Sequence, residues 1–141
     1  MYETVRIIAY ETIRRTMDIK PTNSELEILQ IIWKAGSSTV RQVNEELSKE
    51  KGMVIGYTTT LKLMQIMHEK GLLERETASR THLYKALVSQ SKTSQNMLNT
   101  LIDTVFNGSA AQLIMQALSN KKSSKEEIEM IKEYLDNLDK K

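Results

Sequence analysis

The chain has 141 residues, a formal net charge of +2 and 40% hydrophobic residues, enough for one globular domain or for a domain of about 70 residues with an appendage. It contains no cysteine, which excludes disulfides, thiolate metal sites and cysteine nucleophiles. Its two histidines, His68 near a helix end and His82 on a strand, are expected on different elements, so no metal or other cofactor is expected. No apolar run approaches the roughly 20 residues of a membrane span, so no membrane insertion is expected.

Residues 1–16 combine arginine with apolar residues, as an amphipathic targeting segment does. Their apolar stretch, residues 7–9, is too short for a signal peptide, and Glu3 and Glu11 dilute the positive charge. Met17 stands directly before the first well-patterned segment, so an upstream extension or an alternative start explains residues 1–16 at least as well as a functional helix. We treat residues 1–16 as a dispensable N-terminal extension.

Two capping signatures predict the first two helices. Thr22 and Glu25 have the spacing of a capping box, and Gly36 is placed to end this helix as a left-handed cap. Thr39 and Gln42 repeat the signature at the start of a second, shorter helix. The apolar residues of each helix recur at helical spacing and are expected in the core: Leu26, Leu29 and Trp33, flanked by Ile28 and Ile32, in the first, and Val40, Val43 and Leu47 in the second.

A third helix is expected from residues 56–57 to Gly71. Its apolar face contains Thr60, Leu63, Met64 and Met67. The polar residues Thr58, Thr59, Lys62 and Gln65 fall mostly on the other side and are expected to be exposed. The threonines admit two interpretations: they cap the helix, or their short side chains let the backbone amides approach a phosphate or a base edge.

Beyond Gly71 the apolar period changes from helical to two, in two short stretches around the polar turn 77–80. This pattern predicts a β-hairpin with Arg80 at its tip, where the residue either meets a nucleic acid or serves as an ordinary solubilising charge. Three helices followed by two strands form a winged helix-turn-helix, with the third helix as the recognition helix. The fold is therefore predicted to be mainly α with a small β-hairpin.

We assign residues 17–90 to this DNA-binding domain and residues 91–141 to a helical dimerisation domain. The second segment is expected to form amphipathic helices, interrupted at 107–109, that are too few to bury their own apolar faces. A second copy of the chain is the expected partner, and folding back onto the first domain is the alternative. The residues expected in the dimer interface are Leu98, Leu101, Ile102, Val105, Leu113, Ile114, Ile128, Ile131, Leu135 and Leu138.

The motifs Ser24-Glu25-Leu26-Glu27-Ile28-Leu29 with Ile31-Ile32-Trp33, Tyr57-Thr58-Thr59, Glu69-Lys70-Gly71 and His82-Leu83-Tyr84 occur in this order along the chain. In combination they resemble the penicillinase-repressor, or BlaI/MecI/CopY, family of bacterial transcriptional repressors, from about residue 19 to the C-terminus. The resemblance implies a homodimer bound to palindromic operators on double-stranded DNA. The positions that match the family's DNA-contacting region are Thr58, Thr59, Lys62 and Arg80, with Gln65 as a weaker candidate.

Departures from the family bear on operator choice and on the inducing signal. The position of Ile66 is basic in several relatives, which changes the expected base preference. Copper-responsive relatives use C-terminal cysteines, and this chain has none. Beta-lactam-responsive relatives are cleaved at an Asn-Phe bond by a membrane sensor metalloprotease, and that bond aligns here with Gln116–Ala117. The resemblance thus implies release from DNA by a similar cleavage.

Taken together, these features predict a cytoplasmic, homodimeric, DNA-binding transcriptional repressor. The alternative is a winged-helix module that binds another protein and has no specific affinity for DNA. An enzyme is not expected, because no combination of nucleophile, base and oxyanion donor can be assembled from these residues.

Overall fold

The computed structural model describes residues 3–6, 20–120 and 123–140 of the chain. Of the predicted extension 1–16, only residues 3–6 are among them, so the prediction that it is dispensable lies largely outside the described residues. Two compact units are present, Met1–Met97 and Leu98–Lys141. The division into domains 17–90 and 91–141 stays a prediction. No helix in the described ranges is long and apolar enough to cross a membrane.

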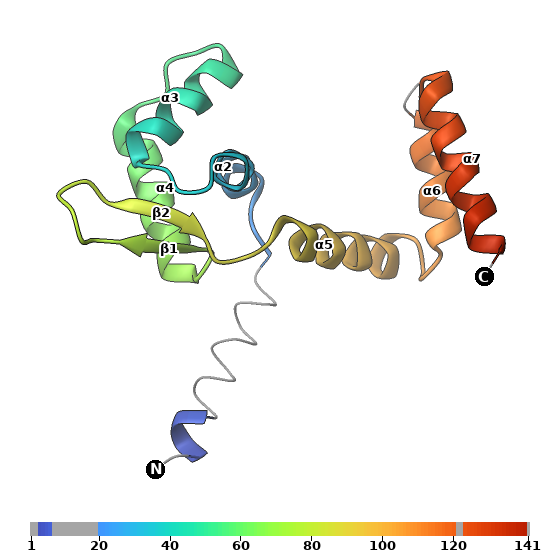
Figure 1. The fold of residues 1–141 in the computed structure, drawn as a ribbon, viewed down its shortest axis with the longest axis horizontal. Helices are drawn as coiled ribbons and strands as arrows, with labels where there is room; N and C mark the ends of the chain where they lie inside the picture. The colour runs from blue at the N-terminus through green and yellow to red at the C-terminus, as the bar shows by residue number, and fades with distance from the viewer. Residues whose placement is uncertain (1–2, 7–19, 121–122, 141) are drawn as a thin grey trace. The chain divides into compact units, whose positions relative to one another are not determined.

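Within the first unit, residues 20–89 form three helices followed by a two-stranded antiparallel hairpin (Figure 1). The prediction of a mainly α winged helix-turn-helix with a small β-hairpin is confirmed. We call the hairpin the wing. The elements among the described residues from 20 onward are α2 (Asn23–Ala35), α3 (Val40–Lys51), α4 (Tyr57–Lys70), β1 (Leu73–Glu76), β2 (Leu83–Ala86), α5 (Gln90–Val105), α6 (Ala110–Asn120) and α7 (Lys125–Asp139).

Both predicted capping boxes are present. The Thr22 amide donates to Glu25 Oε1 (2.8 Å) and the Glu25 amide to Thr22 Oγ1 (3.2 Å). The same pair of bonds joins Thr39 and Gln42 (2.9 and 3.2 Å). The prediction of a left-handed cap at Gly36 was wrong, because its φ of 89° is combined with a ψ of −102°. Only glycine adopts this backbone conformation readily, and it turns the chain toward the wing immediately after α2.

The chain that leaves α2 forms a β-bridge with the wing. Ser38 and Tyr84 exchange both backbone hydrogen bonds, at 3.0 and 2.9 Å. Both residues are almost completely buried. His82 precedes β2 and is not part of the strand, which corrects the expectation that it lies on one. The bridge therefore fixes the start of α3 beside the wing.

The core lies where α2, α3, α4 and the wing meet. The face of α2 that it uses is shifted from the predicted one, because Ile31 is buried together with Ile28, Leu29 and Ile32, whereas Leu26 and Trp33 are only half-buried. Trp33 instead donates its indole N–H to the Val88 carbonyl at 2.8 Å, which holds the segment leading to α5. The buried apolar residues are Ile28, Leu29, Ile31, Ile32, Val40, Val43, Leu47, Met64, Met67, Leu72, Leu73 and Tyr84.

The second unit begins within α5 and continues through α6 and α7. The predicted interruption is present, since Asn107 and Gly108 both have positive φ (49° and 82°) between α5 and α6. Neither α6 nor α7 contains a buried residue among those described. The ten residues predicted for a dimer interface are all half-buried or exposed in the single chain. Their apolar side chains are therefore available to a partner, and the interface itself stays a prediction.

Candidate nucleic-acid interface

The two sides of α4 differ as predicted. Thr60, Met64 and Met67 face the core and are buried, and Leu63 is half-buried. The side chains predicted to contact DNA all lie exposed on the same helix: Thr58, Thr59, Lys62 and Gln65. The structure thus presents a polar helix face of the kind that enters a major groove.

Neither threonine caps α4. The N-cap is Gly56, which has no side chain to accept a hydrogen bond, and the amides of Thr59 and Thr60 both donate to the Gly56 carbonyl (3.1 and 3.3 Å). Within the described part of the chain, the amides of Tyr57 and Thr58 form no hydrogen bond. These amides and the helix dipole leave a partial positive charge at the exposed start of the helix.

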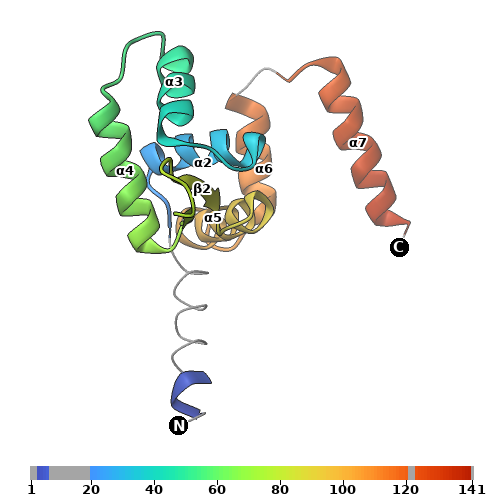
Figure 2. The ribbon, with the colours of Figure 1, turned by 60° about the vertical axis from the view of Figure 1, so that its left-hand side comes forward.

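The loop between α3 and α4 is tied to α3 by side chains that sequence reasoning missed. Asn44 Nδ2 donates to the Ile55 carbonyl and to Thr60 Oγ1, both at 2.9 Å. The Ile55 amide in turn donates to Ser48 Oγ at 3.1 Å. Figure 2 shows this loop leading from the end of α3 to the start of α4. These bonds hold the open N-terminus of α4 in a defined position.

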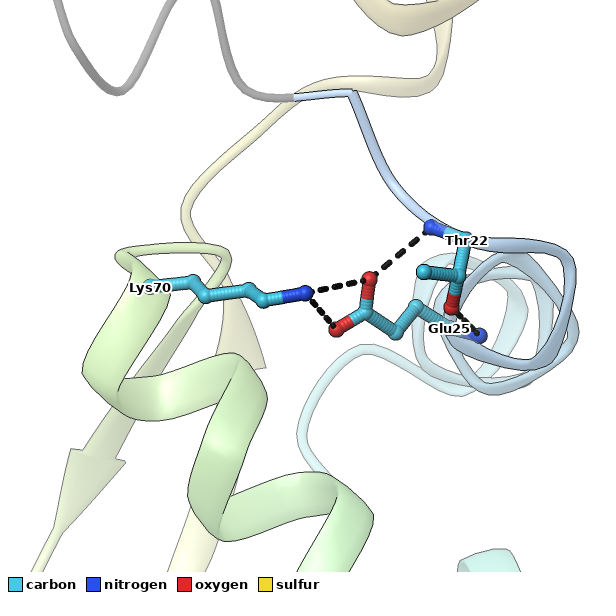
Figure 3. Close-up of polar contacts among 3 residues, drawn as sticks. All are labelled: Thr22, Glu25 and Lys70. Atoms are coloured by element: carbon cyan, nitrogen blue, oxygen red, sulfur yellow. Dashed lines mark hydrogen bonds and ion pairs between the residues drawn. The ribbon is translucent and has the colours of Figure 1, made fainter.

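The C-terminal end of α4 is held by an ion pair with α2. Lys70 Nζ contacts both carboxylate oxygens of Glu25, at 2.9 and 3.2 Å (Figure 3). Burial alone raises the pKa of the Glu25 carboxyl. The hydrogen bonds from the Thr22 amide and from Lys70, together with the Lys70 charge, outweigh burial and hold this pKa below its ordinary value. Glu25 is therefore both a capping residue of α2 and the anchor of the C-terminal end of α4.

A groove of about 480 Å³ lies between the start of α3, the start of α4 and the wing. We call it the wing groove. Arg41, Arg80 and His82 line it and are exposed, and none of them forms an ion pair within the ranges described. The remaining lining residues are Thr39, Val40, Tyr57, Leu61, Thr81 and Tyr84.

The structure separates the predicted site residues into two groups. Arg80 lies in the wing groove, whereas Thr58, Thr59, Lys62 and Gln65 lie outside its lining. Sequence reasoning missed Arg41, Tyr57 and His82 as lining residues. In the sequence, these residues are marked only by their positions next to predicted helix or strand ends. No short-range sequence pattern indicates that the start of α3 lies against the wing.

A cleavage position and the absence of a metal site were predicted as well. Gln116 and Ala117, the expected cleavage position, are exposed within α6, so their peptide bond is part of a helix. In the described ranges no cluster of three or more histidine, aspartate or glutamate side chains could hold a metal ion.

The chain is similar to known repressors over most of its length. A family model described as penicillinase repressor matches residues 21–137. The penicillinase repressor of Bacillus licheniformis is 26% identical over 115 residues, which cover 82% of this chain and 88% of that protein. The methicillin resistance regulatory protein MecI of Staphylococcus aureus strain N315 is 25% identical over 118 residues, covering 81% of this chain and 91% of that protein.

Among solved structures, the one described as the complex structure of hsRosR-S4 aligns with a TM-score of 0.52 at 14% identity, covering 87% of this chain and 93% of that chain. At this level of identity the likeness concerns the fold alone.

Proposed function

The chain belongs to the penicillinase repressor family, and from this premise we propose that it represses transcription as a homodimer on an inverted-repeat operator. As a member of this family it is a DNA-binding repressor and not an enzyme. The observation that carries the proposal is the two-sidedness of α4, which buries one face in the core and leaves a polar face and an uncapped N-terminus exposed.

In the proposed complex each protomer places α4 in the major groove of one half-site. Thr58 and Thr59 contact base edges or phosphates near the helix N-terminus, where the free amides favour negative charge. Lys62 neutralises a backbone phosphate, and Gln65, nearly two helical turns beyond Thr58, is placed to donate to or accept from a base. Arg80 adds a phosphate contact from the wing.

Dimerisation is proposed to join two such domains through the second unit. The apolar side chains of α5, α6 and α7 that stay unburied in one chain support a partner of the same kind. Tethering turns two weak half-site contacts into one strong site. Two symmetric protomers then require an inverted repeat in the DNA.

Release is proposed to follow cleavage by a membrane sensor metalloprotease at Gln116–Ala117. A cut there separates α7 from the DNA-binding domain and shortens the dimer interface, so the tethering advantage is lost. Because the bond lies inside α6, the helix must open locally before an extended segment can enter a protease. We expect such opening to be easy, since α6 contains no buried residue among those described.

The proposal is tested by fluorescence anisotropy with duplexes from the region upstream of the coding sequence, beside random duplexes of equal length. We expect saturable binding to one inverted repeat by two protomers, tighter than binding to random DNA. Equal and wholly salt-driven binding to both would leave only a basic surface and would favour the protein-interaction module. A cytoplasmic location is part of the proposal, because bacterial operators are in the cytoplasm.

The role of Lys62 is tested in the same titration. Lys62→Ala is expected to weaken binding to every duplex and to lower the salt slope by about 0.9 for each phosphate that the protein no longer neutralises. Lys34→Ala is the matched control, because Lys34 is equally exposed and lies outside α4 and the wing groove. Equal slopes for the two variants would exclude the assigned role.

A further inference from the structure

The wing groove gathers three cationic or titratable side chains from two parts of the chain. Arg41 comes from the first turn of α3, and Arg80 and His82 come from the tip of the wing. Arg41 is far from the other two in the sequence, so no local pattern brings them together. Among the described residues, no aspartate or glutamate lines the groove.

Backbone contacts hold the start of α3 against the wing. The two hydrogen bonds between Ser38 and Tyr84 hold the segment before α3 against β2. The Thr39 capping box then sets the first turn of α3, from which Arg41 projects. Because the backbone walls of the groove are already in place, little conformational entropy of the backbone is lost when the groove binds a rigid anionic chain.

We propose that the wing groove binds the phosphate backbone of operator DNA beside the bases that α4 reads, and that Arg41 and His82 are DNA-binding residues together with Arg80. The proposal rests on the proposed function and adds Arg41 and His82 to the wing contact made there by Arg80. The groove adjoins the start of α4, since Tyr57 and Leu61 form part of its lining. A DNA strand that leaves the major groove at this end of α4 therefore passes next to the wing.

The chemistry of the lining suits phosphate. The planar guanidinium groups of Arg41 and Arg80 can each donate two parallel hydrogen bonds to phosphate oxygens. His82 carries a positive charge only when it is protonated, and histidine changes charge between pH 5 and 8. Binding of DNA here is therefore expected to take up protons.

The surroundings of His82 determine the sign of this linkage. The charged and titratable groups that line the groove with it are Arg41 from α3, Tyr57 from α4, Arg80 from the wing tip and Tyr84 from β2. The nearest acidic residue in the strand register is Glu76, which pairs with Leu83. Bound phosphate attracts the protonated form of a histidine beside it. Affinity is then expected to rise as the pH falls.

The arginine contact is tested by salt titration of the full-length protein on a random duplex, because phosphate contacts do not depend on sequence. Arg41→Ala is expected to lower the salt slope by roughly 0.9 per protomer and to weaken binding to random and inverted-repeat duplexes alike. Lys49→Ala, on the same helix but outside the groove, is the matched control and is expected to keep the wild-type slope.

The histidine contact is tested by the same titration at pH 6 and pH 8. Wild-type affinity is expected to be about two- to tenfold higher per protomer at pH 6, which is the range for one added phosphate contact. His82→Gln is expected to remove most of this difference and His68→Gln to keep it. His68 is the suitable control because it is the only other histidine and contacts the Leu73 carbonyl instead of the groove.

The outcomes separate this inference from the proposed function. An unchanged salt slope in Arg41→Ala, or a full pH dependence in His82→Gln, would overturn the groove contact while leaving operator binding by α4 intact. Failure of the wild-type protein to bind either duplex would overturn both. Thermal unfolding by circular dichroism shows that each variant is folded, and all the residues changed except His68 are exposed.

Discussion

The ion pair between Lys70 and Glu25 is expected to contribute measurably to the stability of the first unit. We consider Lys70→Met, which keeps most of the aliphatic side chain and removes the charge. The Glu25 carboxylate is 2% exposed, so without Lys70 it keeps only Thr22 as a hydrogen-bond partner among the described contacts. A buried charge that loses its partner is costly.

The loss of unfolding free energy caused by Lys70→Met is limited by the solvent around the lysine. Removing one partner of a fully buried pair costs about 3–5 kcal/mol. The Lys70 side chain is 40% exposed, so water screens the pair and can reach the carboxylate once the lysine is gone. We therefore expect Lys70→Met to lower the free energy of unfolding by about 1–2 kcal/mol, between the values for surface and buried pairs.

Urea unfolding at pH 7, followed by circular dichroism, measures this loss. The matched control is Lys51→Met, because Lys51 pairs with Glu27 at 3.0 Å and both side chains are 44% exposed. A loss below about 0.5 kcal/mol is expected for that exposed pair. Glu25→Gln combined with Lys70→Met should cost less than the sum of the two single changes, because no unpaired charge remains buried.

The pH dependence gives an independent signature. The folded-state pKa of Glu25 is lowered, so the pair stabilises the fold above the unfolded-state pKa, about 4.3, and this contribution is lost as the pH falls through the folded-state pKa. Stability between pH 5 and pH 3 should therefore fall less steeply in Glu25→Gln than in the wild type. Equal losses for Lys70→Met and Lys51→Met, together with identical pH profiles, would refute this reasoning.

Three further changes probe α4 and the proposed dimer. Gly56→Ser places a capping hydroxyl at the start of α4, where a Cβ meets Thr59 Oγ1 at an ordinary 3.6 Å; thermal unfolding should show a gain of a few tenths of a kcal/mol, and anisotropy a weaker affinity for DNA. Asn44→Ala removes two hydrogen bonds from the α3–α4 loop and should cost about 1–2 kcal/mol in urea unfolding. Leu101→Asp combined with Leu135→Asp should shift the dimer toward monomer in sedimentation velocity, and an unchanged dimer would exclude these residues from the interface.

Local sequence signals predicted the elements of this fold well. The capping boxes at Thr22 and Thr39 define helix starts through contacts only three residues apart, so they can be recognised without a structure. The same holds for the ends of α3 and α4, where Gly52 and Gly71 are both left-handed. The exposed face of α4 followed from helical periodicity alone.

Contacts between distant residues could not be predicted in this way. Glu25 was recognised as a capping residue, but its pairing with Lys70 depends on how α2 packs against α4. The wing groove has the same origin, because the bridge between Ser38 and Tyr84 places Arg41 beside the wing tip. Gly36 was assigned the common helix cap, whereas this bridge requires a different backbone turn there.

The central claim is that the exposed side of α4 reads the operator. The most direct test is the ratio of affinities for the inverted repeat and for a random duplex, measured at one salt concentration for the wild type and for Thr58→Ala combined with Thr59→Ala. Both threonines are exposed and alanine favours helix, so the fold is preserved. We predict that the ratio falls by about tenfold or more, as expected when base recognition is removed and the phosphate contacts remain. An unchanged ratio would contradict the assignment of α4 as the reading helix.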